Sequence, residues 1–223
     1  MLAFLKYLQT TFALRNLGCI NYFLGIEVSH VNGVVHLNQQ KYIQDLLKRS
    51  AMQDSKSIST PRATSTNLSQ LAGDTFSYAS LYCSIVGALQ YVTITRPDIS
   101  YAVNKACQFM AHPTTIHRMA FKRILRYLKG TPSLSVIFHP STSLDIQAYT
   151  DADWASCLDD RRSKTGHCIF LGTNLVSWSS TKQRTISCSS SESEYRALVA
   201  TVAEITWIQF VLENYVFLPY LHH

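Results

Sequence analysis

Several signatures of common enzyme classes are missing from this 223-residue sequence. It has no phosphate-binding glycine-rich loop, no G-x-S-x-G and no H-E-x-x-H, so the chemistries that depend on these motifs find no support. The six cysteines are scattered, without C-x-x-C or zinc-like spacing, which indicates free thiols in a reducing compartment. A serine or cysteine nucleophile served by a distant histidine stays open at this point.

Acidic residues are also scarce. The chain has 14 Asp and Glu against 20 Lys and Arg, a net charge of +6, which favours polyanionic partners. An excess of this size is also common in proteins that bind no nucleic acid. After Asp160 there is no aspartate, and the only later acids are Glu192, Glu194, Glu204 and Glu213. Any metal site in the second half is therefore short of carboxylates.

Targeting and membrane features are not recognisable in the sequence. Residues 1–14 are apolar at helical spacing but lack the basic start and the cleavage site of a signal peptide. No window approaches the roughly 20 uncharged apolar residues of a membrane span. We expect an intracellular protein, cytoplasmic or nuclear, without a membrane partner. With 47% hydrophobic residues, the chain can bury a real core.

The first part of the chain is predicted to be rich in helices. Residues 53–75 are polar and contain Pro61, which indicates a linker or a long surface loop. The predicted elements before it are a helix over 2–14, a strand over Asn21–Val28 that turns at Gly33 into Val34–Leu37, and an amphipathic helix over Gln39–Ser50. Three helices are predicted after this polar stretch. The first covers Ser77–Thr93, the second begins at Thr95-Arg-Pro-Asp98 with Thr95 as its cap, and the third covers about 115–129.

The second part alternates as strands and ends in one helix. Ser191-x-x-Glu194 is a capping-box pattern that starts a helix reaching about Asn214. The sequence therefore predicts an α+β fold with a boundary within 131–143. The predicted strands are Ser135–His139, Leu144–Asp151, Gly166–Leu171 and Val176–Ser179.

Two element ends carry paired carboxylates. The stretch Ala148-Tyr-Thr-Asp-Ala-Asp-Trp-Ala155 predicts a strand that presents Asp151 and Asp153. The helix start at Ser189–Leu198 presents Glu192 and Glu194. Oxygen ligands of this kind suit Mg²⁺ and metal-dependent phosphodiester chemistry. Taken singly, each acid also fits a turn, a strand end or the capping box.

A basic stripe lies on the predicted helix over 115–129. Its residues recur at spacings of 4, 4 and 3 and so share about a quarter of the helix circumference. A one-sided stripe of this kind indicates a phosphate-backbone contact, and a solvated helix face is the plainer alternative. The stripe consists of Arg118, Lys122, Arg126 and Lys129.

Several motifs together, in order and at matching spacing, resemble the Pol polyprotein of copia-type LTR retrotransposons. The first group includes Tyr22-Phe-Leu-Gly-Ile-Glu-Val28, Lys41-Tyr-Ile-Gln-Asp-Leu-Leu47, Thr95-Arg-Pro-Asp-Ile99 and Leu125-Arg-Tyr-Leu-Lys-Gly-Thr131. The second group resembles a ribonuclease H domain and includes Tyr149-Thr-Asp-Ala-Asp-Trp-Ala155, Arg162-Ser-Lys-Thr-Gly166, Trp178-Ser-Ser-Thr-Lys-Gln183 and Ser193-Glu-Tyr-Arg-Ala-Leu198.

The resemblance implies a division of the chain. Residues 1–130 would be the C-terminal part of a reverse transcriptase: the palm end, a primer-grip-like hairpin and the thumb and connection helices. Residues 131–143 would be a linker, and 144–223 a truncated ribonuclease H-like domain with an incomplete sheet and one long helix. The primer-grip residues would be Phe23, Leu24 and Gly25.

The resemblance also implies site residues. Asp151 and Glu194 match two of the four ribonuclease H carboxylates and would bind Mg²⁺, weakly, as a vestigial site. Arg162 and Lys164 match a basic loop of the family. The polymerase aspartates of the family would precede residue 1, and its later ribonuclease H carboxylates have no counterpart here.

The parent polyprotein would synthesise DNA on an RNA template and hydrolyse the RNA strand of RNA–DNA hybrids. We expect the present chain to lack both activities. Its expected partners are an RNA–DNA hybrid or other nucleic acid, and the remainder of the polyprotein. A non-catalytic nucleic-acid-binding module and a decayed gene product without function are the alternatives.

Overall fold

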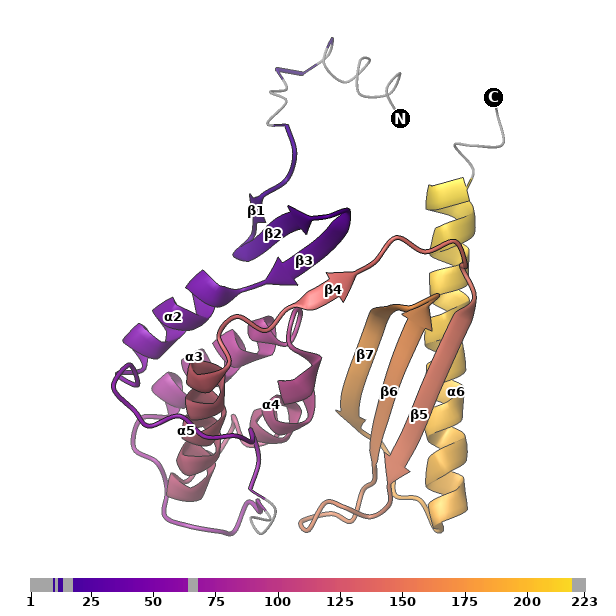
Figure 1. Ribbon diagram of the computed structural model, residues 1–223. Coiled ribbons are helices and arrows are strands. Elements are labelled where there is room, and N and C mark those ends of the chain that lie inside the picture. Colours follow the sequence, from indigo (N-terminus) through magenta and orange to yellow (C-terminus); the bar gives the residue numbers. More distant parts are fainter. Residues whose placement is uncertain (1–9, 11, 14–17, 64–67, 218–223) are drawn as a thin grey trace.

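The computed structural model describes residues 10, 12–13, 18–63 and 68–217, with no side-chain detail for 215–217. A helical group and a small sheet lie on one side of a second, three-stranded sheet, and a long helix lies on the other side (Figure 1). The described chain is mixed α and β with two antiparallel sheets, which confirms the expected class. The helix predicted over 2–14 lies almost entirely outside the described residues.

The first sheet has the strand order β1-β2-β3-β4. Its strands are β1 (Tyr22–Phe23), β2 (Ile26–Val31), β3 (Val34–Asn38) and β4 (Val136–Phe138). The predicted β2–β3 hairpin is confirmed. It turns at Asn32 and Gly33, which both have positive φ, as a tight hairpin turn of right-twisted strands requires.

The single strand predicted over Asn21–Val28 is wrong. Leu24 and Gly25 have φ values of 48° and 83°, so the chain reverses there and β1 pairs back on β2. Tyr91 donates its hydroxyl hydrogen bond to the carbonyl of Leu24, and a Cβ on Gly25 would lie 3.5 Å from the Tyr91 ring. The contact with Tyr91, which is distant in sequence, therefore stabilises a turn at Leu24 and Gly25 that the apolar sequence does not indicate.

β4 falls inside the segment 131–143 that the sequence assigns to a linker. It pairs with β3 through Val35↔Phe138 and Leu37↔Val136, and so completes the first sheet. The segment is thus integrated into the fold of the first part, although the domain boundary itself stays a prediction.

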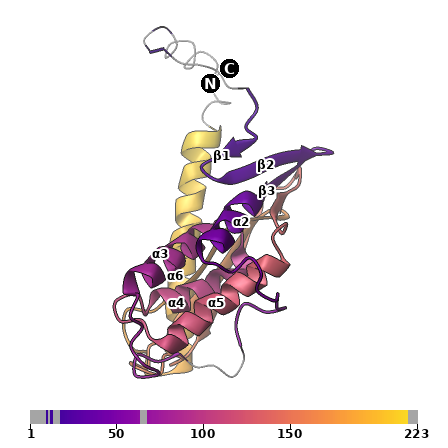
Figure 2. The same ribbon diagram turned by 90° about the vertical axis from the view of Figure 1, so that its left-hand side faces the viewer.

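The helical group consists of α2 (Gln40–Arg49), α3 (Ala79–Val92), the 3₁₀ turn η1 (Pro97–Ile99), α4 (Ser100–Cys107) and α5 (Thr115–Gly130). Figure 2 shows these helices side by side, with the β2–β3 hairpin above them. They share one apolar core, in which burial of aliphatic and aromatic side chains is the main stabilising term. Its members include Ile43, Leu46, Tyr82, Leu89, Ile99, Phe121 and Leu125.

Thr95 does not cap the helix that follows it, contrary to the sequence prediction. It is buried, and its hydroxyl donates to Oε1 of Gln39 at 2.9 Å. The N-cap of η1 is Arg96, without a side-chain cap bond, and Pro97 occupies the first turn as expected. The Thr95 hydroxyl, which the local sequence pattern predicted to cap the following helix, instead bonds to Gln39 at the start of α2.

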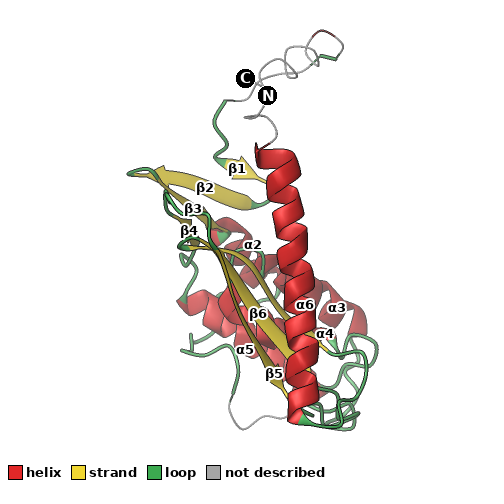
Figure 3. Cartoon of the chain, turned by 90° about the vertical axis from the view of Figure 1, so that its right-hand side faces the viewer, coloured by secondary structure: helices red, strands yellow, loops and turns green. Residues whose placement is uncertain are grey.

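The second sheet has the order β5-β6-β7, formed by β5 (Ile146–Asp153), β6 (Lys164–Leu171) and β7 (Asn174–Lys182). The helix α6 (Ser190–Val211), continued by the π-helical η2 (Leu212–Phe217), packs against β5 and β6 (Figure 3). β7 contacts α4, and Trp178 donates its indole hydrogen bond to the carbonyl of Thr93 at 3.0 Å. The sheet is therefore held between α6 and the helical group.

The start of α6 differs from the predicted capping box. The N-cap is Ser189, whose hydroxyl accepts from the Glu192 amide at 3.1 Å, and Glu192 accepts from the Cys188 amide at 2.7 Å. The box expected from Ser191 and Glu194 is wrong by two residues. Glu194 is free of that role and lies exposed.

One helix in the described part of the chain is long and apolar enough, by length and composition, to cross a membrane. It covers Ser190–Asn214, and its most apolar 18-residue window is 11% buried. This finding goes against the expectation that no segment reaches that length and composition. Helices that pack against a sheet in a soluble protein meet the same criterion, and α6 does pack against β5 and β6. The expected absence of a membrane partner stays a prediction.

Candidate nucleic-acid interface

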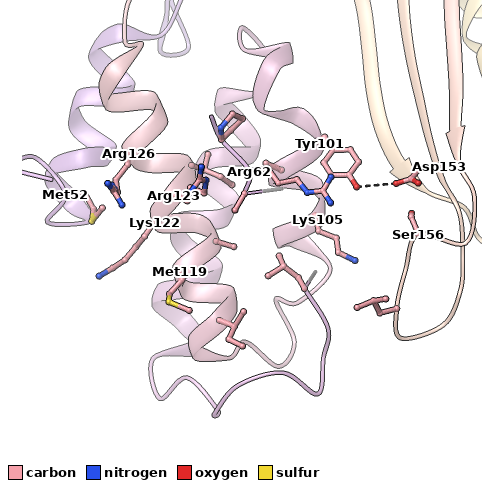
Figure 4. Close-up of a pocket in the computed structure, with 18 of the residues that line it drawn as sticks. Met52, Arg62, Tyr101, Lys105, Met119, Lys122, Arg123, Arg126, Asp153 and Ser156 are labelled. Carbon is pink, nitrogen blue, oxygen red and sulfur yellow. Dashed lines mark hydrogen bonds between the residues drawn. The ribbon is translucent and has the colours of Figure 1, made fainter. Parts of the chain in front are cut away.

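A cavity of about 920 Å³ lies between the helical group and the end of β5. Its walls come from α5, α4, the segment 52–63 and the loop that follows β5 (Figure 4). A side-chain contact spans the two sides, because the Tyr101 hydroxyl of α4 donates to Asp153 of β5 at 3.5 Å. The volume lies within the range of ligand sites in proteins.

The lining of this cavity is strongly positive. The described residues that line it include a single carboxylate, Asp153, and seven basic side chains from four segments: Lys56, Arg62, Lys105, Lys122, Arg123, Arg126 and Arg161. Low-dielectric walls focus the field of clustered charges and raise the local concentration of an oppositely charged ligand. The arrangement therefore suits an anion that carries several charges.

The sequence of α5 explains how its basic residues reach the cavity. Phe121, Leu125 and Leu128 are buried in the apolar core, which directs the Lys122 and Arg126 side of the helix outward. Arg126 donates from Nε to the carbonyl of Lys56 at 2.6 Å. The first part of the polar stretch 53–75, which was expected as a linker or a long surface loop, thus contacts α5.

Arg123 adds a second contact and an unsatisfied donor. Its Nη2 donates to the hydroxyl of Thr60 at 2.7 Å. Its Nε is buried and has no hydrogen-bond partner among the described residues. A buried donor without a partner is costly, and an acceptor on a ligand in this cavity would relieve it.

The structure divides the basic stripe predicted on α5. Lys122 and Arg126 line the cavity. Arg118 lies with its guanidinium 5.4 Å from the ring centroid of Phe76, and Lys129 donates to the carbonyl of Ser55 at 2.6 Å. Sequence reasoning missed Arg123, which lies on α5 beside the predicted stripe but outside its spacing. It also missed the cations on other segments, which no local pattern connects to α5: Lys56, Arg62, Lys105 and Arg161.

Lys164 and Arg162, predicted to contact nucleic acid, are not among the residues that line the cavity. Lys164 is buried, with its Nζ 3.7 Å from the ring centroid of Tyr101. Burial, followed by the charges of Lys105 and Arg62, lowers the pKa of Lys164 to about 8. Arg162 is ion-paired with Asp160 at 3.4 Å. Their binding roles stay predictions, and burial argues against a phosphate contact by Lys164.

The two predicted catalytic carboxylates lie on the surface. Asp151 is exposed on β5, opposite Gly166 of β6, and Glu194 is exposed in the first turns of α6. Within the described ranges, no group of three or more His, Cys, Asp or Glu side chains could hold a metal ion. This donor set does not fit a site for two Mg²⁺ ions. The approach of Asp151 to Glu194 and the vestigial-site role stay predictions.

The primer-grip-like residues occupy the β1–β2 turn. Phe23 and Leu24 are 57% and 71% exposed, and Gly25 packs against Tyr42 and Tyr91. The turn thus presents apolar side chains outward on an aromatic support, with the two tyrosine rings 5.1 Å apart. A contact of this turn with a nucleic-acid strand stays a prediction.

Comparison with known proteins identifies the relatives of this chain. An uncharacterized mitochondrial protein of Arabidopsis thaliana, AtMg00810, is 48% identical, with 90% of this chain and 83% of the relative covered. The retrovirus-related Pol polyprotein from transposon RE1 of Arabidopsis thaliana is 45% identical over 92% of this chain, and that from transposon TNT 1-94 of Nicotiana tabacum is 34% identical over 93%.

The chain belongs to the copia-type retrotransposon Pol family. The resemblance inferred from its motifs is therefore confirmed. The chain spans only 14% of the RE1 polyprotein and 16% of the TNT 1-94 polyprotein, so it corresponds to one part of a Pol polyprotein. No protein-family model matches the chain. No solved structure matches it either.

Proposed function

We propose that this part of a copia-type Pol protein holds an RNA–DNA hybrid without cleaving it. Polymerisation and cleavage of the RNA strand would be activities of the whole polyprotein. The observation that supports the proposal most is the cavity between α5 and the end of β5, where seven basic side chains meet one carboxylate. Nucleic acids supply the closely spaced negative charges that such a lining attracts.

The acidic residues are the reason why we propose binding of the hybrid without hydrolysis of its RNA strand. The basic side chains come from both parts of the chain, whereas Asp151 and Glu194 are accompanied by no third metal-ligating side chain in the described ranges. Phosphate contacts need only cations, because they act through charge and counterion release. Phosphodiester hydrolysis by two metal ions needs a complete set of oxygen donors. We therefore expect binding to persist where hydrolysis does not.

The test is the salt dependence of binding. The double variant Lys122→Gln, Arg161→Gln removes one cation from α5 and one from the loop that follows β5, which lie on opposite sides of the cavity. The logarithmic salt slope for an RNA–DNA hybrid should fall by up to about 0.9 for each lost duplex contact. Fluorescence anisotropy at several salt concentrations measures it.

The matched control is Lys41→Gln, Lys48→Gln, which removes the same charge from α2, outside the cavity lining. It should leave the slope unchanged. Equal slopes for all three proteins would refute a role of the cavity in binding. Absence of any salt-sensitive binding would favour the alternative of a gene product without function.

A further inference from the structure

The cavity is more than a positive surface, because part of its lining is apolar. Leu68 and Ile124 are buried, whereas Met119 on α5 and Leu158 in the loop after β5 are 62% and 49% exposed. The last two side chains come from opposite walls of one cavity. Large apolar side chains exposed beside cations mark a site for a ligand with both an apolar and an anionic portion.

A base-paired duplex can contact the cations of such a lining but does not use its exposed apolar side chains. Its bases are stacked inside, and it offers phosphates on a convex surface to a protein. An unpaired nucleotide offers a flat base together with its phosphate. Proteins that hold single strands combine a basic track for the backbone with side chains that pack on the base faces.

We infer that this cavity receives unpaired nucleotides of a strand that continues from the bound hybrid. The base would pack between Met119 and Leu158, since a methionine thioether makes favourable contacts with aromatic rings. The phosphates would face Lys122 and Arg126 on the α5 wall (Figure 4). The buried Nε of Arg123 would find its missing acceptor there. This inference rests on the proposed binding of a hybrid and names the strand segment that the cavity selects.

The direct experiment compares two ligands by fluorescence anisotropy at fixed salt. One is a blunt RNA–DNA hybrid, and the other is the same hybrid with five unpaired nucleotides on one strand, tried on each strand in turn. The overhang should strengthen binding by up to roughly tenfold, the upper end for a methionine thioether packed on an aromatic ring. A free single strand and a mononucleotide are further arms that separate a strand from a lone nucleotide.

The variants Met119→Ser and Leu158→Ser should each remove most of the overhang advantage and leave the affinity for the blunt hybrid within about twofold, because neither carries charge. Leu134→Ser is the matched control, since Leu134 is 48% exposed and does not line the cavity. It should keep the full advantage. Because the substituted residues are exposed, folding should survive, and a thermal melt checks this.

The outcomes are distinguishable. Equal binding of blunt and overhang hybrids would overturn the inference and leave the proposed function standing. An overhang advantage that both serine variants retain would also overturn it, since the base would then bind elsewhere. If the unmodified chain bound neither hybrid, both the proposed function and the inference would be refuted.

Discussion

At the residue scale, the proposed function follows from a difference between the basic and the acidic side chains: the basic ones are clustered and the two expected catalytic acids are not. Seven cations share one cavity, whereas Asp151 and Glu194 stand exposed on a strand and a helix. Mg²⁺ takes six oxygen ligands in strict geometry, so a site with few protein donors binds it weakly. Among the described residues, Asp151 and Glu194 belong to no group of three or more His, Cys, Asp or Glu side chains that could hold a metal ion.

The prediction for these acids concerns cleavage of a labelled RNA–DNA hybrid with Mg²⁺ or Mn²⁺. The unmodified chain and Asp151→Asn should both cleave at the background rate, because the donor set cannot position two ions in line with a phosphate. Product formation is followed by gel electrophoresis. Clear activity that disappears in Asp151→Asn would contradict the prediction and require a further carboxylate, such as one from a second chain.

At the element scale, one buried arginine connects the start of η1 to the end of α5. Arg96 is 1% exposed, pairs through two nitrogens with Asp98, and donates to the carbonyl of Thr131 at 2.7 Å. Burial alone would raise the pKa of Asp98, but hydrogen bonds from Arg96 and Tyr127 and the Arg96 charge hold it below its usual value. The ion pair lies at the start of η1, and hydrogen bonds connect it to Tyr127 and Thr131 at the end of α5.

Arg96→Ala should destabilise the fold by about 2 kcal/mol, since it removes the packing of a buried side chain and its hydrogen bonds to Asp98 and Thr131, while the Asp98 carboxylate stays partly exposed. The depressed pKa of Asp98 stabilises the fold above the ordinary carboxyl pKa. That stabilisation is lost as the pH falls through the lower folded-state value. Urea unfolding at neutral and acid pH measures both effects.

Asp98→Asn is the control for the pH effect. It should be less stable than the unmodified chain at neutral pH and should lose less stability on acidification. If its loss of stability with acid matched that of the unmodified chain, Asp98 would not be the group responsible.

At the scale of the whole molecule, the second part of the chain packs against the first. The sheet β5-β6-β7 packs against α4 through β7, and Trp178 reaches back to Thr93. The side of α6 that faces away from the sheet carries several exposed apolar side chains. Its large exposed side chains are Tyr195, Leu198, Val199, Val202, Trp207 and Phe210.

Residues 140–223 expressed alone should therefore aggregate or form a loosely packed state. Separation would uncover the sheet face that α4 now contacts, beside the open edge of β5 and the apolar side of α6. Size-exclusion chromatography and a thermal melt, run beside the whole chain, test this. A soluble monomer with a sharp cooperative melt would contradict it.

The sequence alone determined most of the elements and the family. Alternation over Leu144–Asp151 and 3.6-residue spacing over 115–129 predicted β5 and α5, because strand and helix periods are set by neighbouring residues. Gly33 predicted the turn of the β2–β3 hairpin for the same local reason. The motifs predicted the copia-type Pol family, and the relatives confirm it.

Only the tertiary structure decided which residues meet. Arg62, Lys122 and Arg161 are separated by tens of residues, and no local pattern says that they line one cavity. Long-range packing also moved Thr95 from a cap to a buried contact with Gln39, and placed Lys164 under Tyr101. Local hydrogen bonding and periodicity form the elements, whereas burial between distant segments determines which side chains stay free for a ligand.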